Sequence, residues 1–311
     1  MKDNKILVTG GAGFIGSCLV KNLLLKRFKV LVYDNFFTGK FENLPKSNES
    51  YLTIVEGDII DQEKLSDSLE KFQPSLVFHL AGLHYIPYCN KHPLETLRVN
   101  VEGTQSILEV CKRLEIEKII FTSSAAIYRA VDYALQEKEY ISPIDSYGFS
   151  KFFAEKLIEL FHTSTATPCI IARLFNVYGP NETNPHVIPH IIDQLKSKHT
   201  LELGNLNPKR DYIYVGDVAS ALITLAQFDT DFDIFNIGNG KEYSVQDIIN
   251  VCGKILVRNL RVVSKERLCR KIDRLHLLSD ISKIKSATGW SPKFDLETGL
   301  IRLLKSEGII K

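Results

Sequence analysis

Tyr147 and Lys151 are the residues of this chain whose types and spacing most directly suggest catalysis. They lie four positions apart, which on a helix places both side chains on one face, one turn apart. A phenol has a pKa of about 10, too high for proton transfer at neutral pH. A neighbouring ammonium favours the phenolate and would move this pKa toward the range of a general base. By itself the pattern is a weak signal, and an ordinary amphipathic helix would be the better interpretation, so its meaning depends on the other motifs of the chain.

A glycine-rich turn near the start of the chain gives the pair a context. Residues 5–9 are an apolar run typical of a buried strand, and residues 18–25 form an apolar helical stretch. Gly10, Gly13 and Gly16 lie between them. Glycines at this spacing permit a tight turn, close backbone approach to a pyrophosphate, and close packing of helix on strand. The first N–H groups of the helix would then face the phosphates.

Asp34 completes a dinucleotide-binding pattern. It follows a second apolar run at 29–33, close to the spacing expected of the acid that holds the ribose hydroxyls. A carboxylate accepts from a free ribose 2′-hydroxyl and repels a 2′-phosphate, and no arginine follows it closely. The sequence therefore predicts NAD as the cofactor, in preference to NADP.

The elements that must position these residues alternate along the first half of the chain. Further strands are predicted at 51–55, 75–79, 118–122 and 169–173, with helices at 62–72, 93–113 and 147–161. This alternation indicates an α/β fold, a doubly wound parallel sheet of Rossmann type. Ligands of such sheets bind at the carboxyl ends of the strands, so the residues after each strand should rim one site. These residues are Asp58, Ala81, Gly82, Ser123, Ser124, Phe175 and Asn176.

Two domains are predicted, a dinucleotide-binding domain at 1–173 and a smaller α/β substrate lobe at 174–311. Turn signals multiply beyond residue 174, which favours a separate lobe. Elements around 211–238 are expected to return to the first domain, with a strand at 233–236 rejoining its sheet.

Composition narrows the classes of function. The 311 residues are 44% hydrophobic and 24% charged, as in an ordinary globular protein, and the net charge of +2 argues against a nucleic-acid partner. Six cysteines and eight histidines show no metal-ligand spacing, so no metal is expected. The chain has no apolar run of membrane-spanning length and no apolar signal region at its start. We therefore expect no membrane partner and a cytoplasmic location.

Taken in order, several motifs resemble those of the extended short-chain dehydrogenase/reductases, and in particular their NAD-dependent nucleotide-sugar epimerases and dehydratases. The resemblance runs over nearly the whole length. The matching stretches are TGGAGFIG at 9–16, GD at 57–58, LAG at 80–82, NVEGT at 100–104, YxxxK at 147–151, RLFNVYGP at 173–180, RDYIYV at 210–215 and GWSP at 289–292.

The resemblance implies roles for individual residues. Ser124 would hydrogen-bond the 4-oxygen of the sugar, Tyr147 would shuttle its proton, and Lys151 would hold the nicotinamide ribose and tune Tyr147, with help from the charge of the oxidised nicotinamide. The implied NAD-binding residues are Gly10, Gly13, Phe14, Ile15, Gly16, Asp34, Asn35, Asp58, Ile59, Leu80, Ala81, Gly82, Asn100, Tyr147 and Lys151. The implied residues for a nucleotide-diphosphate sugar, with UDP favoured, are Ser124, His84, Asn176, Arg210 and Arg270.

The departures from the family pattern bear on the reaction. Dehydratases carry Asp-Glu directly after the catalytic serine, and decarboxylases carry a glutamate at the second position, whereas this chain has Ala125 and Ala126. A methyl group cannot transfer a proton, so a 4-epimerase is predicted, most similar to those of UDP-glucose, UDP-galactose or UDP-N-acetylglucosamine. The unusually aromatic run at 83–89 and Arg129, at a position that is usually glycine, leave alternatives open. These are a 4,6-dehydratase, a 4-dehydrogenase, a 4-keto reductase, or a dinucleotide-binding module without catalysis.

The resemblance also implies a homodimer. The helices predicted at 93–113 and 147–161 are those that pair between subunits in the family.

Overall fold

A computed structural model describes residues 4–46, 50–197, 200–268 and 274–311 of the chain. It divides into two compact units. The first comprises residues 1–129, 140–174 and 219–235, and the second comprises residues 130–139, 175–218 and 236–311. The segment 130–139, which the predicted division assigns to the first domain, thus belongs to the second unit. Residues 219–235 belong to the first.

The first unit is built on a seven-stranded sheet with strand order β11-β7-β5-β4-β1-β2-β3. The ladders from β3 across to β7 are all parallel. The order reverses beside β1, as it does in doubly wound sheets. The strands are β1 (Lys5–Thr9), β2 (Lys29–Asp34), β3 (Leu52–Glu56), β4 (Leu76–His79), β5 (Lys118–Ser124), β7 (Cys169–Leu174) and β11 (Phe232–Ile237). The predicted return of a strand near 233–236 to this sheet is confirmed.

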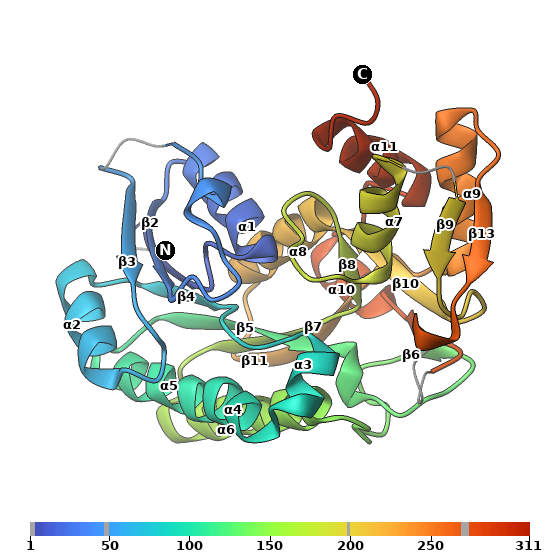
Figure 1. The fold of residues 1–311 in the computed structure, drawn as a ribbon. Helices are drawn as coiled ribbons and strands as arrows, with labels where there is room; N and C mark the ends of the chain where they lie inside the picture. Colours follow the sequence, from blue (N-terminus) through green and yellow to red (C-terminus); the bar gives the residue numbers. More distant parts are fainter. Residues whose placement is uncertain (1–3, 47–49, 198–199, 269–273) are drawn as a thin grey trace. The chain divides into compact units, whose positions relative to one another are not determined.

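Helices cover both faces of this sheet, with α1 on one side and α5 and α6 on the other (Figure 1). The central strands are apolar because both of their faces are buried. The helical segments are α1 (Phe14–Leu25), η1 (Phe41–Asn43), α2 (Gln62–Phe72), α3 (Ile86–Lys91), α4 (Pro93–Leu97), the π-helix η2 (Arg98–Glu102), α5 (Gly103–Arg113), η3 (Ala125–Ile127), α6 (Ser146–Thr165) and α8 (Val215–Gln227), which crosses from the second unit.

The helix predicted at 93–113 is interrupted by the π turn η2. The N–H of Gly103 bonds to the carbonyl of Arg98, five residues back, so this turn holds one residue more than an α turn would. Helix α6 begins one residue earlier than predicted because Asp145 caps it, accepting from the N–H of Gly148 at 2.7 Å. Strand β5 continues to Ser124, so Ser123 and Ser124 are its last residues and do not follow it.

The second unit contains three small sheets, in the orders β12-β10-β8, β13-β9 and β14-β6. Its core is formed by apolar residues such as Ile191, Leu201, Ile248 and Leu300. The elements are β6 (Ala134–Leu135), β8 (Asn176–Tyr178), α7 (Val187–Leu195), β9 (Thr200–Leu203), β10 (Lys209–Tyr214), β12 (Glu242–Ser244), α9 (Val245–Leu256), β13 (Arg261–Ser264), η4 (Glu266–Leu268), β14 (Leu278–Ser279), α10 (Ser282–Thr288) and α11 (Leu296–Ser306).

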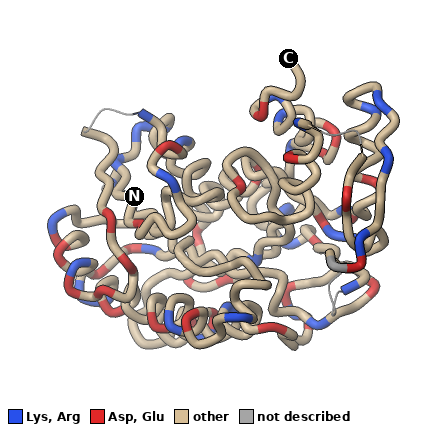
Figure 2. The backbone as a smooth tube through the Cα atoms, in the orientation of Figure 1, with Lys and Arg blue, Asp and Glu red and all other residues tan. Residues whose placement is uncertain are grey.

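Helix α2 carries both acidic and basic residues (Figure 2). No helix within the described ranges is long and apolar enough to cross a membrane. The same ranges contain no group of three or more His, Cys, Asp or Glu side chains arranged to hold a metal ion.

Candidate active site

The glycine-rich turn joins β1 to α1 as the sequence predicts. Gly10 has a φ of 69°, and a Cβ at this position would lie 2.8 Å from the backbone nitrogen of Ala81. A Cβ at Gly16 would lie 2.1 Å from the carbonyl oxygen of Gly10, so only glycine fits there. Gly13 is the N-cap of α1 and supplies no capping side chain, and the first turn of α1 contains no acid. This helix start therefore has the free N–H groups and the charge balance that a phosphate requires.

Asp34 lies at the carboxyl end of β2, directly beside this turn. One carboxylate oxygen accepts from the N–H of Ala12 and the other from the N–H of Phe36, both at 2.9 Å. Burial raises the pKa of Asp34, and these backbone N–H groups oppose the rise. The N–H of Gly13 also bonds to this carboxylate, and a carboxylate offers about four lone-pair positions, so the group can still accept from a hydroxyl.

Asn35 and Asp58 meet at the ends of β2 and β3, where Asn35 donates to the Asp58 carboxylate at 2.9 Å. Ile59 is 4% exposed and packs in the core, where a Cβ at Gly103 would lie 2.5 Å from its Cδ1. Phe14 is buried and Ile15 half-buried at the start of α1.

The segment that follows β4 approaches the catalytic helix. Leu80 and Ala81 both donate their N–H to Oγ1 of Thr9, at 3.2 Å each. Gly82 has a φ of 156°, and a Cβ there would lie 2.9 Å from Oδ1 of Asn100 and 3.6 Å from Nζ of Lys151. The predicted NAD-binding glycine and the predicted catalytic lysine are therefore neighbours.

Asn100 is 2% exposed and lies in the π turn, where its side chain is fully bonded. Its Oδ1 accepts from the N–H of Leu83 at 2.7 Å, and its Nδ2 donates to the carbonyl of Leu83 and to Oγ of Ser150, both at 2.8 Å. It thus ties the segment after β4 to helix α6.

Ser124, Tyr147 and Lys151 come together at the carboxyl edge of the sheet. The side chains of Ser124 and Tyr147 are hydrogen-bonded to each other. Lys151 is one turn further along α6, and its Nζ donates to the carbonyl of Thr122 at 2.8 Å. The same ammonium lies 4.8 Å from the centre of the Phe121 ring. Strand β5 therefore contacts both Tyr147, through the side chain of Ser124, and Lys151, through Thr122 and Phe121.

The pKa values of this set correct one expectation. Burial raises the pKa of Tyr147, and the hydrogen bond from Ser124 only partly opposes the rise. The predicted net lowering of this pKa is wrong for these surroundings, because burial penalises the phenolate more than the hydrogen bond from Ser124 favours it. Burial lowers the pKa of Lys151 to about 8, against the opposing effect of Glu155.

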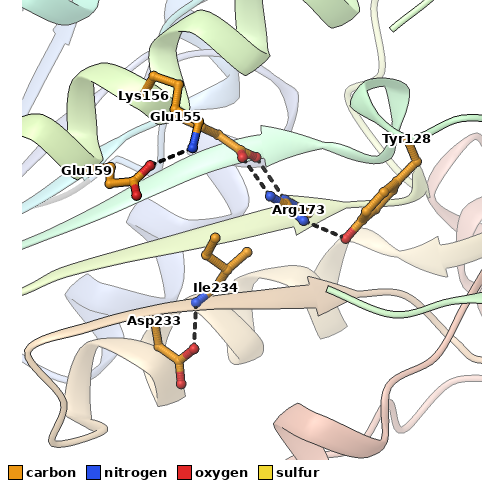
Figure 3. Close-up of polar contacts among 7 residues, drawn as sticks. All are labelled: Tyr128, Glu155, Lys156, Glu159, Arg173, Asp233 and Ile234. Atoms are coloured by element: carbon orange, nitrogen blue, oxygen red, sulfur yellow. Dashed lines mark hydrogen bonds and ion pairs between the residues drawn. The ribbon is translucent and has the colours of Figure 1, made fainter. Parts of the chain in front are cut away.

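Sequence reasoning missed a buried ion pair between Glu155 and Arg173 (Figure 3). Glu155 lies four residues beyond Lys151 on α6, and its carboxylate accepts from Nε and Nη2 of Arg173 at 2.9 and 2.8 Å. Nη1 of Arg173 donates to the hydroxyl of Tyr128 at 2.9 Å. A signal was available, because an arginine that ends an apolar strand needs a buried partner, and the helix face of Tyr147 and Lys151 supplies one.

The residues predicted to bind substrate are spread over both units. In the second unit, Tyr212 pairs with Asn176 across β10 and β8, and Arg210 lies two residues before Tyr212. Side chains two apart on a strand share a face, so Arg210 and Asn176 lie on the same face of that sheet. Nη1 of Arg210 donates to the carbonyl of Lys209 at 2.7 Å. His84, in the first unit, is half-buried in the loop before α3, and Arg270 lies outside the described residues.

Comparison with known proteins shows the family of the chain. A family model for GDP-mannose 4,6 dehydratase matches residues 7–303. A putative UDP-glucose 4-epimerase of Methanocaldococcus jannaschii is 35% identical over 306 residues, covering 96% of this chain and 97% of that protein.

Solved structures of similar length superpose closely. A UDP-glucose 4-epimerase of Thermotoga maritima with UDP-glucose is 30% identical with a TM-score of 0.89, covering 97% of each chain. One from Thermus thermophilus, in complex with NAD, is 31% identical with a TM-score of 0.87, covering 97% of this chain and 98% of that one. The chain therefore belongs to the extended short-chain dehydrogenase/reductases, in the family of nucleotide-sugar epimerases and dehydratases that the GDP-mannose 4,6-dehydratase model describes.

Proposed function

We propose that this protein is an NAD-dependent nucleotide-sugar 4-epimerase. The observation that carries the proposal is the set of Ser124, Tyr147 and Lys151, followed by two alanines where the dehydratases have an acid and a base. Ala125 is 1% exposed and Ala126 is half-buried, so neither position offers a group that could exchange a proton with the sugar.

The residues present fit NAD. The start of α1, which has no acid in its first turn and no side-chain cap, suits the pyrophosphate. Asp34 suits a ribose diol, and Gly82 leaves backbone space beside Lys151. When bound, NAD would accept a hydride from carbon 4 of the sugar and return it to the opposite face.

Side chains of the protein would transfer the proton of the sugar 4-hydroxyl. Tyr147 as phenolate would take the proton of the 4-hydroxyl while the hydride leaves carbon 4, and as phenol would return it when the hydride comes back. Ser124 would hold the 4-oxygen, which carries negative charge as the carbonyl is reduced. The ammonium of Lys151, together with the charge of the oxidised nicotinamide, would offset the effect of burial on the phenol. No atom is gained or lost over the cycle.

For the substrate we propose a nucleoside-diphosphate sugar, with UDP favoured. Arg210 and Asn176 share one sheet face in the second unit, and a guanidinium suits a diphosphate. Several related structures carry UDP-sugars, including the Thermotoga maritima enzyme with UDP-glucose. We propose that His84, in the first unit, contributes to sugar binding, and that Arg270, outside the described residues, contributes to diphosphate binding.

The decisive experiment replaces Tyr147 by Phe and follows conversion of UDP-glucose and UDP-galactose by NMR. Loss of the proton carrier should lower kcat by about 10²- to 10⁴-fold with the fold retained. Tyr51→Phe, at a half-exposed tyrosine beside β3, is the matched control. Near-normal turnover by Tyr147→Phe would refute the assignment.

The alternatives give different products in the same assay. A dehydratase would form a sugar nucleotide lacking one water, and a dehydrogenase or keto reductase would change the net amount of reduced cofactor. Bound NAD without any hydride exchange over a sugar panel would favour a binding module.

We also propose a homodimer formed through α4 and α6. Leu94, Phe149, Phe153 and Leu160 expose 81%, 45%, 46% and 65% of their surface there, and apolar exposure of this kind marks interfaces. The five described cysteines are unpaired, which suits a reducing compartment, and we propose the cytoplasm.

A further inference from the structure

His79 is the last residue of β4 and is 1% exposed, yet the sequence assigns it no role. Its ring lies between two threonine hydroxyls. Nδ1 is 2.7 Å from Oγ1 of Thr9, and Nε2 is 3.0 Å from Oγ1 of Thr104. Strands β1 and β4 and helix α5 therefore meet at this ring.

The protons of this cluster can be assigned from Thr104. Its hydroxyl has one proton, which it donates to the carbonyl oxygen of Asn100 at 2.6 Å. Oγ1 of Thr104 must then accept from His79, so Nε2 carries the ring proton. A neutral imidazole has one such proton, and Nδ1 is consequently the acceptor for the hydroxyl of Thr9.

Thr9 leaves no room for a second ring proton. Its Oγ1 already accepts from the N–H of Ala81 and shares the N–H of Leu80 with the carbonyl of Thr9, so both of its lone pairs are engaged. A proton on Nδ1 of His79 would require a third acceptor site on that oxygen. Burial acts in the same direction and lowers the pKa of His79 to about 3, with the charge of Lys151 adding to the effect. The ring is therefore neutral, and one tautomer alone satisfies its neighbours.

The hydrogen bonds continue from Asn100 to the catalytic helix. The side chain of Asn100 donates to Oγ of Ser150 at 2.8 Å, and that hydroxyl donates to the carbonyl of Tyr147 at 2.7 Å. An unbroken path therefore runs from Thr9, the residue before the glycine-rich turn, to the main chain of Tyr147.

A second path leads from His79 to Lys151. The hydroxyl of Thr122 donates to the main-chain carbonyl of His79 at 3.1 Å, and the carbonyl of Thr122 accepts from Nζ of Lys151 at 2.8 Å. The main chain of His79 thus contacts the strand residue that holds the lysine.

We propose that His79, fixed as its Nε2-protonated tautomer, is a positioning residue that couples the glycine-rich turn to Tyr147 and Lys151 through Thr9, Thr104 and Asn100. Its effect on catalysis rests on the proposed epimerase function, because it acts by keeping the phenol and ammonium in register with a dinucleotide held at the turn. A displacement of about 1 Å can cost about 10²-fold in rate, so a network of this kind has a measurable effect.

The test uses the full chain with ¹⁵N-labelled histidine, together with two variants of Thr104. NMR should find His79 protonated on Nε2 and free of titration across the range in which an ordinary histidine, with a pKa of about 6.5, changes charge. Thr104→Val keeps the shape but removes the hydroxyl, and should lower kcat by about 10- to 100-fold with little change in KM for the sugar nucleotide. Thr104→Ser restores the hydroxyl and should restore kcat.

Three results would overturn the proposal: a proton on Nδ1, titration of His79 near its ordinary pKa, or equal loss of kcat in both Thr104 variants. His162→Gln is the matched control, because that ring bonds to the carbonyl of Thr167, outside either path, and the variant should keep kcat.

The NAD affinity of the same variants tests the role of His79 even if the proposed epimerase reaction is wrong. If the wild-type protein epimerises no sugar, weaker NAD binding by Thr104→Val with recovery in Thr104→Ser still supports the coupling. Equal NAD affinities of wild type and Thr104→Val would then overturn it.

Discussion

Replacing Glu155 by Gln should leave a buried positive charge without its partner. Arg173 and Glu155 expose only 2% and 4% of their side chains, and the guanidinium reaches the carboxylate through two bonds. Arg173 remains charged in the variant, because a guanidinium is not deprotonated in proteins. Gln keeps the shape and one oxygen acceptor but removes the negative charge.

The expected loss of stability follows from this burial. Removing one partner of a buried ion pair costs about 3–5 kcal/mol. Gln still accepts one hydrogen bond, and the hydroxyl of Tyr128 still accepts from Nη1 of Arg173 at 2.9 Å, so we expect about 3 kcal/mol. The neighbouring pair of Lys156 and Glu159 on the same helix is more than half exposed, and such a pair is worth about 0–1 kcal/mol.

The assay is urea denaturation, followed by amide hydrogen exchange in α6 so that the readout belongs to the first unit. Lys156→Gln is the matched control, because it breaks an ion pair one position away at the surface (Figure 3). Adding Arg173→Met to Glu155→Gln should recover part of the lost stability, since no buried charge then remains. Equal effects of Glu155→Gln and Lys156→Gln would refute the reasoning.

Three further predictions concern other parts of the molecule. Burial lowers the pKa of Lys151 from 10.5 to about 8. Between these two pH values the amine is neutral in the folded protein and charged in the unfolded chain, so unfolding takes up a proton. The free energy of unfolding should therefore rise with pH from about 8 to 10.5, by about 3 kcal/mol, and urea midpoints should show no such rise in Lys151→Met. Gly16→Ala should displace the turn by pressing Cβ against the carbonyl of Gly10, and calorimetry should find NAD binding lost or weakened at least tenfold, about 1.4 kcal/mol. Phe153→Lys should convert a dimer to monomers in sedimentation, whereas the same change at the exposed Leu25, on α1, should not.

The sequence predicted those features that depend on local pattern. Apolar runs placed the strands of the main sheet to within about two residues, and the glycine spacing located the turn between β1 and α1. Tyr147 and Lys151 share a helix face, as their spacing indicates, and the hydrogen bond of Ser124 brings it to them.

The rest depended on contacts between distant segments. The bond of His79 to Thr9 spans 70 residues, and that of Arg173 to Tyr128 spans 45, so neither partner can be chosen without the sheet order and register. The pKa of Tyr147 was predicted in the wrong direction, because a motif shows the neighbouring charge but not the depth of burial.

The extra residue in the π turn has a consequence for how this helix tolerates changes in length. Because Gly103 bonds five residues back to Arg98, loss of one residue between them would leave an ordinary α turn, and α4 and α5 would continue as a single regular rod. The cost would fall on Asn100, whose amide depends on the wider turn to meet Leu83 and Ser150 together. A shorter and straighter helix would therefore lose the hydrogen bonds by which Asn100 links Leu83 to Ser150.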